Sequence, residues 1–141
     1  MTVNISNFYL RRCQEKDLPG ILEIVNEQIT NSTTSFWYEP DSLESKMAWF
    51  KSSEENGFPI IVAVEHKENG EEKVAGYAAL GKYRPQHAYL YTTELSLYCH
   101  KDYRGFGLGK RLMSEIIHIG KKKGYRTIIC KQNNSPLLPT I

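Results

Sequence analysis

The sequence predicts a single α/β domain, residues 1–141, with a mixed and mainly antiparallel sheet flanked by helices. Two apolar runs, the first of them rich in β-branched residues, stand on either side of Asn69-Gly70, which is a strong hairpin signal. Residues 89–100 form another apolar run, which leads through a glycine-rich turn into an amphipathic helix and a further strand-like run. Such a strand–helix–strand unit predicts one parallel pair. The expected element order is β-α-α-β-β-β-α-β.

The first strand and the first helix are expected between Phe8 and about Ile29. Apolar and polar residues alternate in Phe8–Cys13, as they do in a half-buried strand. Asp17 can cap the segment that follows, and Pro19 is tolerated in a first helical turn. The residues that then recur at helical spacing are Leu18, Ile21, Leu22, Val25 and Ile29.

A second helix is expected from Asp41-Ser-Leu-Glu44, which has the spacing of a capping box. Leu43, Met47 and Phe50 recur on one face of this helix. We therefore expect the helix to bury these three residues and to end near Ser53.

Three strands are expected in the middle of the chain. Pro59–Glu65 is continuous and β-branched, which predicts a buried strand, and Lys73–Leu80 returns antiparallel to it. Gly76 inside the second run indicates a bulge or the close approach of another backbone. Tyr89–His100 is the expected central strand. Its alternation places Glu94, Ser96 and Tyr98 on one face and Leu95, Leu97 and Cys99 on the other.

The last regular elements are a helix over residues 107–123 and a strand that begins at Thr127–Cys130. Gly124, with lysines just before it, marks the end of the helix. The crossover rule makes the strand parallel to the central strand. The helix residues expected to be buried are Leu108, Leu112, Met113, Ile116, Ile117 and Gly120.

Composition and charge describe an ordinary globular protein, with 40% hydrophobic and 24% charged residues. No apolar run approaches the roughly 18 residues of a membrane span, and the N-terminus lacks a signal-peptide pattern, so we expect a cytoplasmic protein with no membrane partner. The widely spaced cysteines, Cys13, Cys99 and Cys130, predict buried thiols rather than disulfides. No CxxC or HxxxH spacing suggests a metal site.

A basic stretch, residues 101–126, contrasts with the small net charge of +2. Lysines and arginines there outnumber the two acidic residues, Asp102 and Glu115. This stretch is either a solvated helix face or a source of field that attracts a polyanion toward the glycine-rich turn. It lacks a nucleic-acid recognition motif, so we expect no nucleic-acid partner.

The turn Arg104–Lys110 has the properties of a phosphate-binding loop. Its glycines, Gly105, Gly107 and Gly109, let the backbone approach a ligand, and the first turn of the following helix offers free N–H groups to an anion. A dinucleotide fingerprint counted from Gly105 would need a glycine at Lys110. A P-loop ending at Gly109-Lys110 would need glycine at Arg104 and a hydroxyl residue at Arg111. Neither motif fits.

The spacing Arg104-x-x-Gly107-x-Gly109 resembles the acyl-CoA pyrophosphate loop of the GNAT superfamily of N-acetyltransferases. Together with Glu94 and the alternating strand, it resembles the signature of the phosphinothricin acetyltransferase-like branch. The resemblance runs from about Tyr9 to Ile129 and implies a GNAT-like fold. The tail 131–141 differs from the branch, so we expect a shortened domain that lacks the usual last helix and strands. The exposed sheet edge that this leaves favours a homodimer.

The resemblance implies acetyl-CoA as co-substrate and Glu94 as general base. Glu94 interrupts an apolar strand, and burial raises the pKa of a carboxyl toward the range useful for a base, although a salt-bridged surface residue is the alternative. The implied contacts to pantetheine are backbone groups of Leu97, Tyr98 and Cys99, as if the ligand were an added strand. An amide of Leu97 or Cys99 would stabilise the oxyanion. The implied pyrophosphate contacts are Arg104, Gly105, Phe106, Gly107, Leu108, Gly109 and Lys110.

For the acceptor site the resemblance suggests Phe36, Trp37, Tyr83 and Arg84. The consecutive aromatic residues Phe36, Trp37 and Tyr38 suit either simple packing or an apolar wall for a small substrate. Arg84 suits a substrate carboxylate, which arginine binds with two hydrogen bonds. The implied reaction is acetyl transfer to a small amino-acid-like amine of the phosphinothricin or methionine sulfoximine type. Two alternatives stay open: a different amine, such as a peptide N-terminus or polyamine, and a non-catalytic acyl-CoA-binding module.

Overall fold

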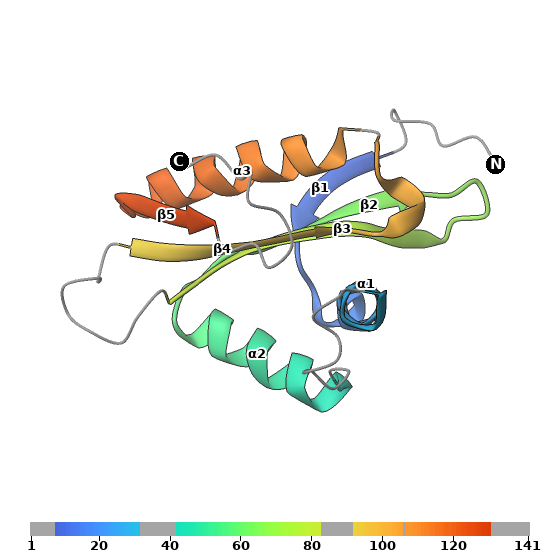
Figure 1. The fold of residues 1–141 in the computed structure, drawn as a ribbon, viewed down its shortest axis with the longest axis horizontal. Coiled ribbons are helices and arrows are strands. Elements are labelled where there is room, and N and C mark those ends of the chain that lie inside the picture. Colours follow the sequence, from blue (N-terminus) through green and yellow to red (C-terminus); the bar gives the residue numbers. More distant parts are fainter. Residues whose placement is uncertain (1–7, 32–41, 83–91, 106, 131–141) are drawn as a thin grey trace.

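A computed structural model describes residues 8–31, 42–82, 92–105 and 107–130. These residues form one five-stranded sheet in the order β1-β2-β3-β4-β5, with α1 and α2 against one face and α3 against the other (Figure 1). The expected element order is confirmed. The strands are β1 (Phe8–Arg12), β2 (Ile60–His66), β3 (Glu72–Lys82), β4 (Thr92–Cys99) and β5 (Thr127–Cys130). The helices are η2 (Glu15–Asp17), α1 (Leu18–Asn31), α2 (Leu43–Glu55), η5 (Lys101–Tyr103) and α3 (Leu108–Lys122).

Strand pairing agrees with the predicted hairpin and crossover. β1 to β4 pair antiparallel with their neighbours, and β4 pairs parallel with β5. The prediction that β4 is the central strand is wrong for the described residues, in which β3 is the middle strand. The reason is that β1 adds outside β2, so two strands lie on each side of β3.

The alternation predicted for β4 is confirmed, because its two sets of side chains enter two different cores. Leu95 is buried on the α3 side, where Leu97 and Cys99 also pack. Tyr98 packs on the opposite side, against residues of α1, α2 and the inner strands. On the α3 side, Leu108, Leu112, Ile116 and Gly120 are buried at helical spacing, as expected. Strand β4 therefore contributes side chains to both cores, one on each face of the sheet.

Gly76 shows both features that its place in a strand indicated. The register pairs Ala63 with Gly76 but Val64 with Val74, so Ala75 is an extra residue on β3 and forms a bulge. A Cβ on Gly76 would lie 3.0 Å from the backbone oxygen of Tyr98. Glycine is therefore needed at this position of β3, next to the C-terminal half of β4.

The start of α2 differs from the sequence prediction. Ser42 is the N-cap, and its hydroxyl oxygen accepts the N–H of Ser45 at 3.1 Å. The capping box that was expected at Asp41 begins at a residue outside the described ones. Leu43, expected in the core, is 45% exposed, whereas Phe50 is buried. The N-terminal end of α2 lies farther from the sheet than its C-terminal end, so its first turn does not reach the core (Figure 1).

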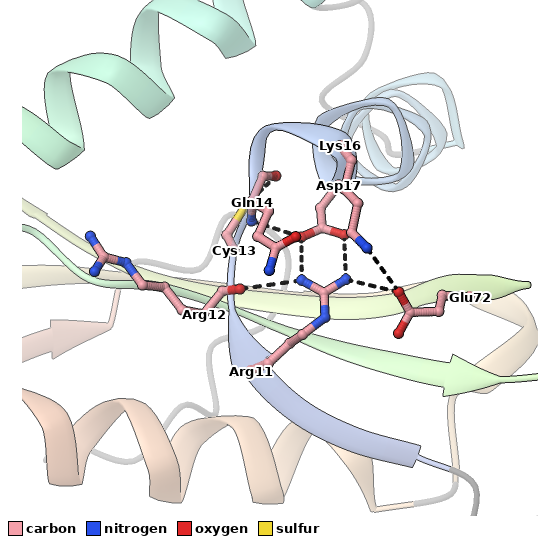
Figure 2. Close-up of polar contacts among 7 residues, drawn as sticks. All are labelled: Arg11, Arg12, Cys13, Gln14, Lys16, Asp17 and Glu72. Carbon is pink, nitrogen blue, oxygen red and sulfur yellow. Dashed lines mark hydrogen bonds and ion pairs between the residues drawn. The ribbon is translucent and has the colours of Figure 1, made fainter.

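The sequence suggested that Asp17 caps the helix that follows. Its side chain instead closes the turn before α1. Its carboxylate accepts the N–H of Gln14 at 2.8 Å and forms two hydrogen bonds with the guanidinium of Arg11 at 2.7 and 2.8 Å (Figure 2). Glu72 of β3 approaches the same guanidinium at 3.5 Å. The pairing ties the end of β1 to the start of α1, and α1 then buries Leu18, Ile21 and also Ile24, which the sequence pattern missed.

Two further predictions concern cysteines and membranes. Cys13 is buried, Cys99 is half-buried, and both are free thiols, as expected; the side chain of Cys130 lies outside the described residues. Among the helices described, none is long and apolar enough to span a bilayer. Nor does any group of three or more potential metal ligands occur in the described part of the chain.

Candidate active site

The turn from β4 to α3 is built around two glycines with left-handed backbone. Gly105 has φ +89° and Gly107 has φ +78°, a region that costs other residues about 1–2 kcal/mol. A Cβ on either residue would meet no atom within 4 Å. Backbone conformation, and not lack of space, therefore requires glycine here. The same open space leaves the backbone of this turn accessible to a ligand.

The N-terminus of α3 presents unpaired amide groups beside this turn. Gly107 is the N-cap without a side-chain hydrogen bond, and the first helical bond runs from the N–H of Arg111 to the carbonyl of Gly107 at 3.2 Å. The N–H groups of residues 108–110 therefore have no acceptor within the helix. The exposed cations Lys110 and Arg111 add positive charge to the helix dipole. We call Gly105 and Gly107–Lys110 the phosphate cradle, because this arrangement attracts an anion.

Arg104, expected to contact the cofactor, makes an ion pair with α1. Its Nη2 lies 3.3 Å from Oε2 of Glu27, and its side chain is 49% exposed. An exposed pair of this kind contributes little to stability. The guanidinium therefore lies at the edge of the cradle with a weak partner, which a phosphate can replace.

The outer edge of β4 opens next to the cradle. Within the described residues β5 pairs with Thr92–Leu95 only, so Ser96–Cys99 has a neighbouring strand on its β3 side alone. A Cβ on Gly109 would lie 3.7 Å from side-chain atoms of Leu97 and Cys99, which places the first turn of α3 directly against this segment. An extended ligand pairing with β4 would therefore run toward the cradle.

Glu94 lies on the other face of β4, which carries Ser96 and Tyr98. It is half-buried and pairs in register with Gly81 of β3 and Ile129 of β5. The pKa of the Tyr98 phenol is raised, first by burial and then by the negative charge of Glu94. The carboxylate is thus close enough to Tyr98 to act on it electrostatically.

An aromatic cluster on the same face was missed by sequence reasoning. It consists of Trp49, Tyr77 and Tyr98, with ring centroids of Tyr77 and Tyr98 5.6 Å apart and those of Trp49 and Tyr77 6.0 Å apart. Lys46 lies 4.7 Å above the Trp49 ring. The register between β3 and β4, which pairs Tyr77 directly with Tyr98, brings these rings together. No local sequence pattern indicates that register.

Some predicted site residues cannot be placed. Leu97, Tyr98, Cys99, Arg104, Gly105 and Gly107–Lys110 converge on the end of β4 and the start of α3. The expected acceptor residues and one loop residue, namely Phe36, Trp37, Tyr83, Arg84 and Phe106, lie outside the described residues, as does Tyr38.

Comparisons with known proteins identify the class that this fold and turn define. The sequence pattern of the acetyltransferase (GNAT) family matches residues 22–139. The chain belongs to the GNAT family of acetyltransferases.

One similar protein has a named activity. An L-methionine sulfoximine/L-methionine sulfone acetyltransferase of Pseudomonas paraeruginosa is 38% identical over 114 residues, which cover 80% of this chain and 63% of the relative. The chain thus spans less than two thirds of that relative's length.

Two solved structures have the same fold. An N-acetyltransferase from Staphylococcus aureus matches with a TM-score of 0.81 and 37% identity, covering 92% of this chain and 76% of the other. A GNAT superfamily phosphinothricin acetyltransferase from Sinorhizobium meliloti, in complex with acetyl-CoA, matches with a TM-score of 0.78 and 32% identity. This match covers 88% of this chain and 65% of the other.

Proposed function

We propose that this chain binds acetyl-CoA and transfers its acetyl group to the amine of a small amino-acid-like acceptor. The observation that carries the proposal is the open edge of β4, which leads directly into the phosphate cradle. Family membership supports the donor, and relatives that acetylate methionine sulfoximine or bind acetyl-CoA support the substrate class. Metal chemistry has no part in the proposal.

The residues of the site fit the donor's two chemical parts. Backbone groups of Leu97, Tyr98 and Cys99 pair with the pantetheine amides as a neighbouring strand would. The amides of the cradle, together with Arg104 and Phe106, bind the pyrophosphate, whose charge suits the helix N-terminus and the basic side chains. Leu108 contributes only its N–H, because its side chain is buried in the core.

Glu94 acts as general base in this proposal. It removes a proton from the acceptor ammonium, directly or through a water, and the freed nitrogen lone pair attacks the thioester carbonyl carbon. The C–S bond then breaks, CoA leaves as thiolate, and the second proton that the nitrogen loses on becoming an amide neutralises this thiolate or passes to solvent. A backbone amide of β4, at Leu97 or Cys99, stabilises the oxyanion formed between these steps. The aromatic cluster forms part of the acceptor wall on the Glu94 face.

Direct transfer is favoured over an acyl-enzyme at Cys99. Burial raises the pKa of the Cys99 thiol, and only the positive charge of Arg104 opposes this effect. A thiol with a raised pKa is a poor nucleophile at neutral pH. The nearest histidine in the sequence, His100, points its ring nitrogens at Glu23 and the N–H of Asp102. Nothing in these contacts activates the thiol.

The decisive experiment compares wild type with Glu94→Gln in a CoA-release assay. The amines tested are methionine sulfoximine, methionine sulfone, phosphinothricin, a polyamine and a peptide with a free N-terminus. We expect kcat at neutral pH to fall by about 10²-fold or more, because the amine stays protonated. Acetyl-CoA affinity should not change. Glu71→Gln, an exposed carboxylate in the β2–β3 turn, is the matched control. Full rate for Glu94→Gln would show that another group is the base.

A further inference from the structure

A buried hydrogen bond lies directly before the phosphate cradle. The phenol of Tyr103, the last residue of η5, donates to Oε1 of Glu65 at 2.7 Å, although the two residues are 38 positions apart. Tyr103 is 4% exposed and Glu65 is 6% exposed. No salt bridge to Glu65 occurs among the described residues. Within this part of the chain, the phenol of Tyr103 is therefore the side-chain partner of the Glu65 carboxylate.

Two aromatic contacts hold the Tyr103 ring. Phe8 of β1 and His100 each meet it edge-on, with ring centroids 5.6 Å away. Phe8 pairs in register with Glu65, so the ring and the carboxylate are fixed by neighbouring strands. Burial and the Glu65 hydrogen bond raise the pKa of Tyr103, which keeps the phenol a donor throughout the neutral range.

The exposed turn that carries Gly105 and Gly107 lies between two buried side chains. Tyr103 precedes this turn, and Leu108, which is 1% exposed, follows it at the start of α3. The intervening residues Arg104, Gly105 and Gly107 are exposed, and both glycines have positive φ. An exposed loop of this kind keeps its shape only if both ends are held. The shape determines where the cradle N–H groups point, and preorganised groups bind with less loss of conformational entropy.

We propose that the Tyr103–Glu65 pair is a positioning device that sets the geometry of the phosphate cradle for the donor's pyrophosphate. This inference rests on the proposed function for its ligand. The claim concerns residues that do not touch the donor: Tyr103 and Glu65 act through the backbone of the turn. If the pair had a purely structural role, breaking it would lower the stability of the protein but leave the affinity of the folded protein for the donor unchanged.

The test uses Tyr103→Phe and Glu65→Gln with Tyr125→Phe as matched control. Tyr125 loses the same hydroxyl but stacks on Phe58 near the C-terminal end of the 15-residue helix α3, at the opposite end of this helix from the cradle. Two readouts are taken well below the unfolding temperature. Calorimetry gives acetyl-CoA affinity, and the amide chemical shifts of Gly105 and Gly107–Gly109 report on the ligand-free cradle.

We expect Tyr103→Phe to weaken acetyl-CoA binding by about tenfold and to shift the amide resonances of the cradle, because the backbone of the turn changes its geometry. Glu65→Gln should stay within about threefold of wild type, because the glutamine oxygen still accepts the phenol proton. Steady-state kinetics should show the loss in the KM for acetyl-CoA and not in the KM for the amine. Tyr125→Phe should match wild type in all readouts.

A second variant removes the stability problem that an orphaned Glu65 carboxylate creates in Tyr103→Phe. Tyr103→Phe combined with Glu65→Leu replaces both polar partners by apolar groups. This double variant should recover the stability of the core while keeping the loss of acetyl-CoA affinity. If Tyr103→Phe or the double variant is folded and keeps the wild-type amide chemical shifts at the cradle, the positioning role is refuted. If wild type itself fails to bind acetyl-CoA, the proposed function fails, whereas the chemical shifts of the ligand-free cradle still decide the positioning claim.

Discussion

Asp17 illustrates how one buried carboxylate secures the connection between a strand and a helix. It is 4% exposed, and Arg11, its partner, is 18% exposed. The Arg11 guanidinium binds both carboxylate oxygens, and this hydrogen bond is the main reason that its pKa is raised. Glu72 and Lys16 extend the network toward solvent (Figure 2). Charge that is buried in this way is tolerated only while its partner remains.

We predict that Asp17→Asn lowers the free energy of unfolding by about 3 kcal/mol, because the Arg11 charge loses its buried partner. Glu72→Gln is the control: its carboxylate is 25% exposed, and the change should cost no more than about 1 kcal/mol. Urea denaturation of both variants measures the difference. Equal, small effects would show that the pair contributes no more than a surface ion pair.

At the residue scale, the sequence indicates candidate site residues where they lie close together along the chain. Glu94 and the glycines lie within one continuous stretch, which resembles a family signature, and their roles stay proposals. Tyr103 lies in that same stretch, but its partner Glu65 is on another strand and no local pattern connects them. Trp49 was missed for the same reason, because only the folded sheet brings α2 next to Tyr77.

At the scale of elements, the start of α3 depends on a backbone conformation. Gly107→Ala adds a methyl group that meets no atom within 4 Å, so its cost comes from the positive φ alone, about 1–2 kcal/mol. We predict that this variant remains folded and binds acetyl-CoA several-fold more weakly, because the cradle amides turn away from the pyrophosphate.

Gly57→Ala provides the matched control for Gly107→Ala. Gly57 has φ +72°, and a Cβ there also meets no atom within 4 Å, but it lies in the turn before β2. The two variants should lose similar stability in thermal unfolding, while calorimetry should show weaker acetyl-CoA binding for Gly107→Ala alone. Equal affinity in the two variants would contradict the assignment of the cradle.

Elements were predicted well where periodicity was strong, as in α3 and the β2–β3 hairpin. The start of α2 was not, since Asp41 and Ser42 are both good caps and local sequence does not choose between them. Which residue caps depends on where the helix meets the sheet. The same limit explains Leu43, whose helical spacing indicates burial although the first turn of α2 lies away from the core.

At the scale of the whole molecule, β4 joins two layers with different roles. Its α1–α2 face carries Glu94 and the aromatic cluster, whereas its end leads to the cradle on α3. In the proposed function, the free edge of β4 gives the donor access to both. The cytoplasmic location and the homodimer expected from the sequence stay predictions, as does the placement of the acceptor residues.

Acetyl transfer by this chain is the central claim, and the most direct measurement follows both products together. Wild type is incubated with acetyl-CoA and methionine sulfoximine, and free CoA thiol and N-acetylated product are quantified by mass spectrometry. We predict that the two appear in equal amounts and only when amine and protein are both present. Binding of acetyl-CoA without any acetylated product, for this amine and the others in the panel, would contradict the claim and identify a non-catalytic acyl-CoA-binding module.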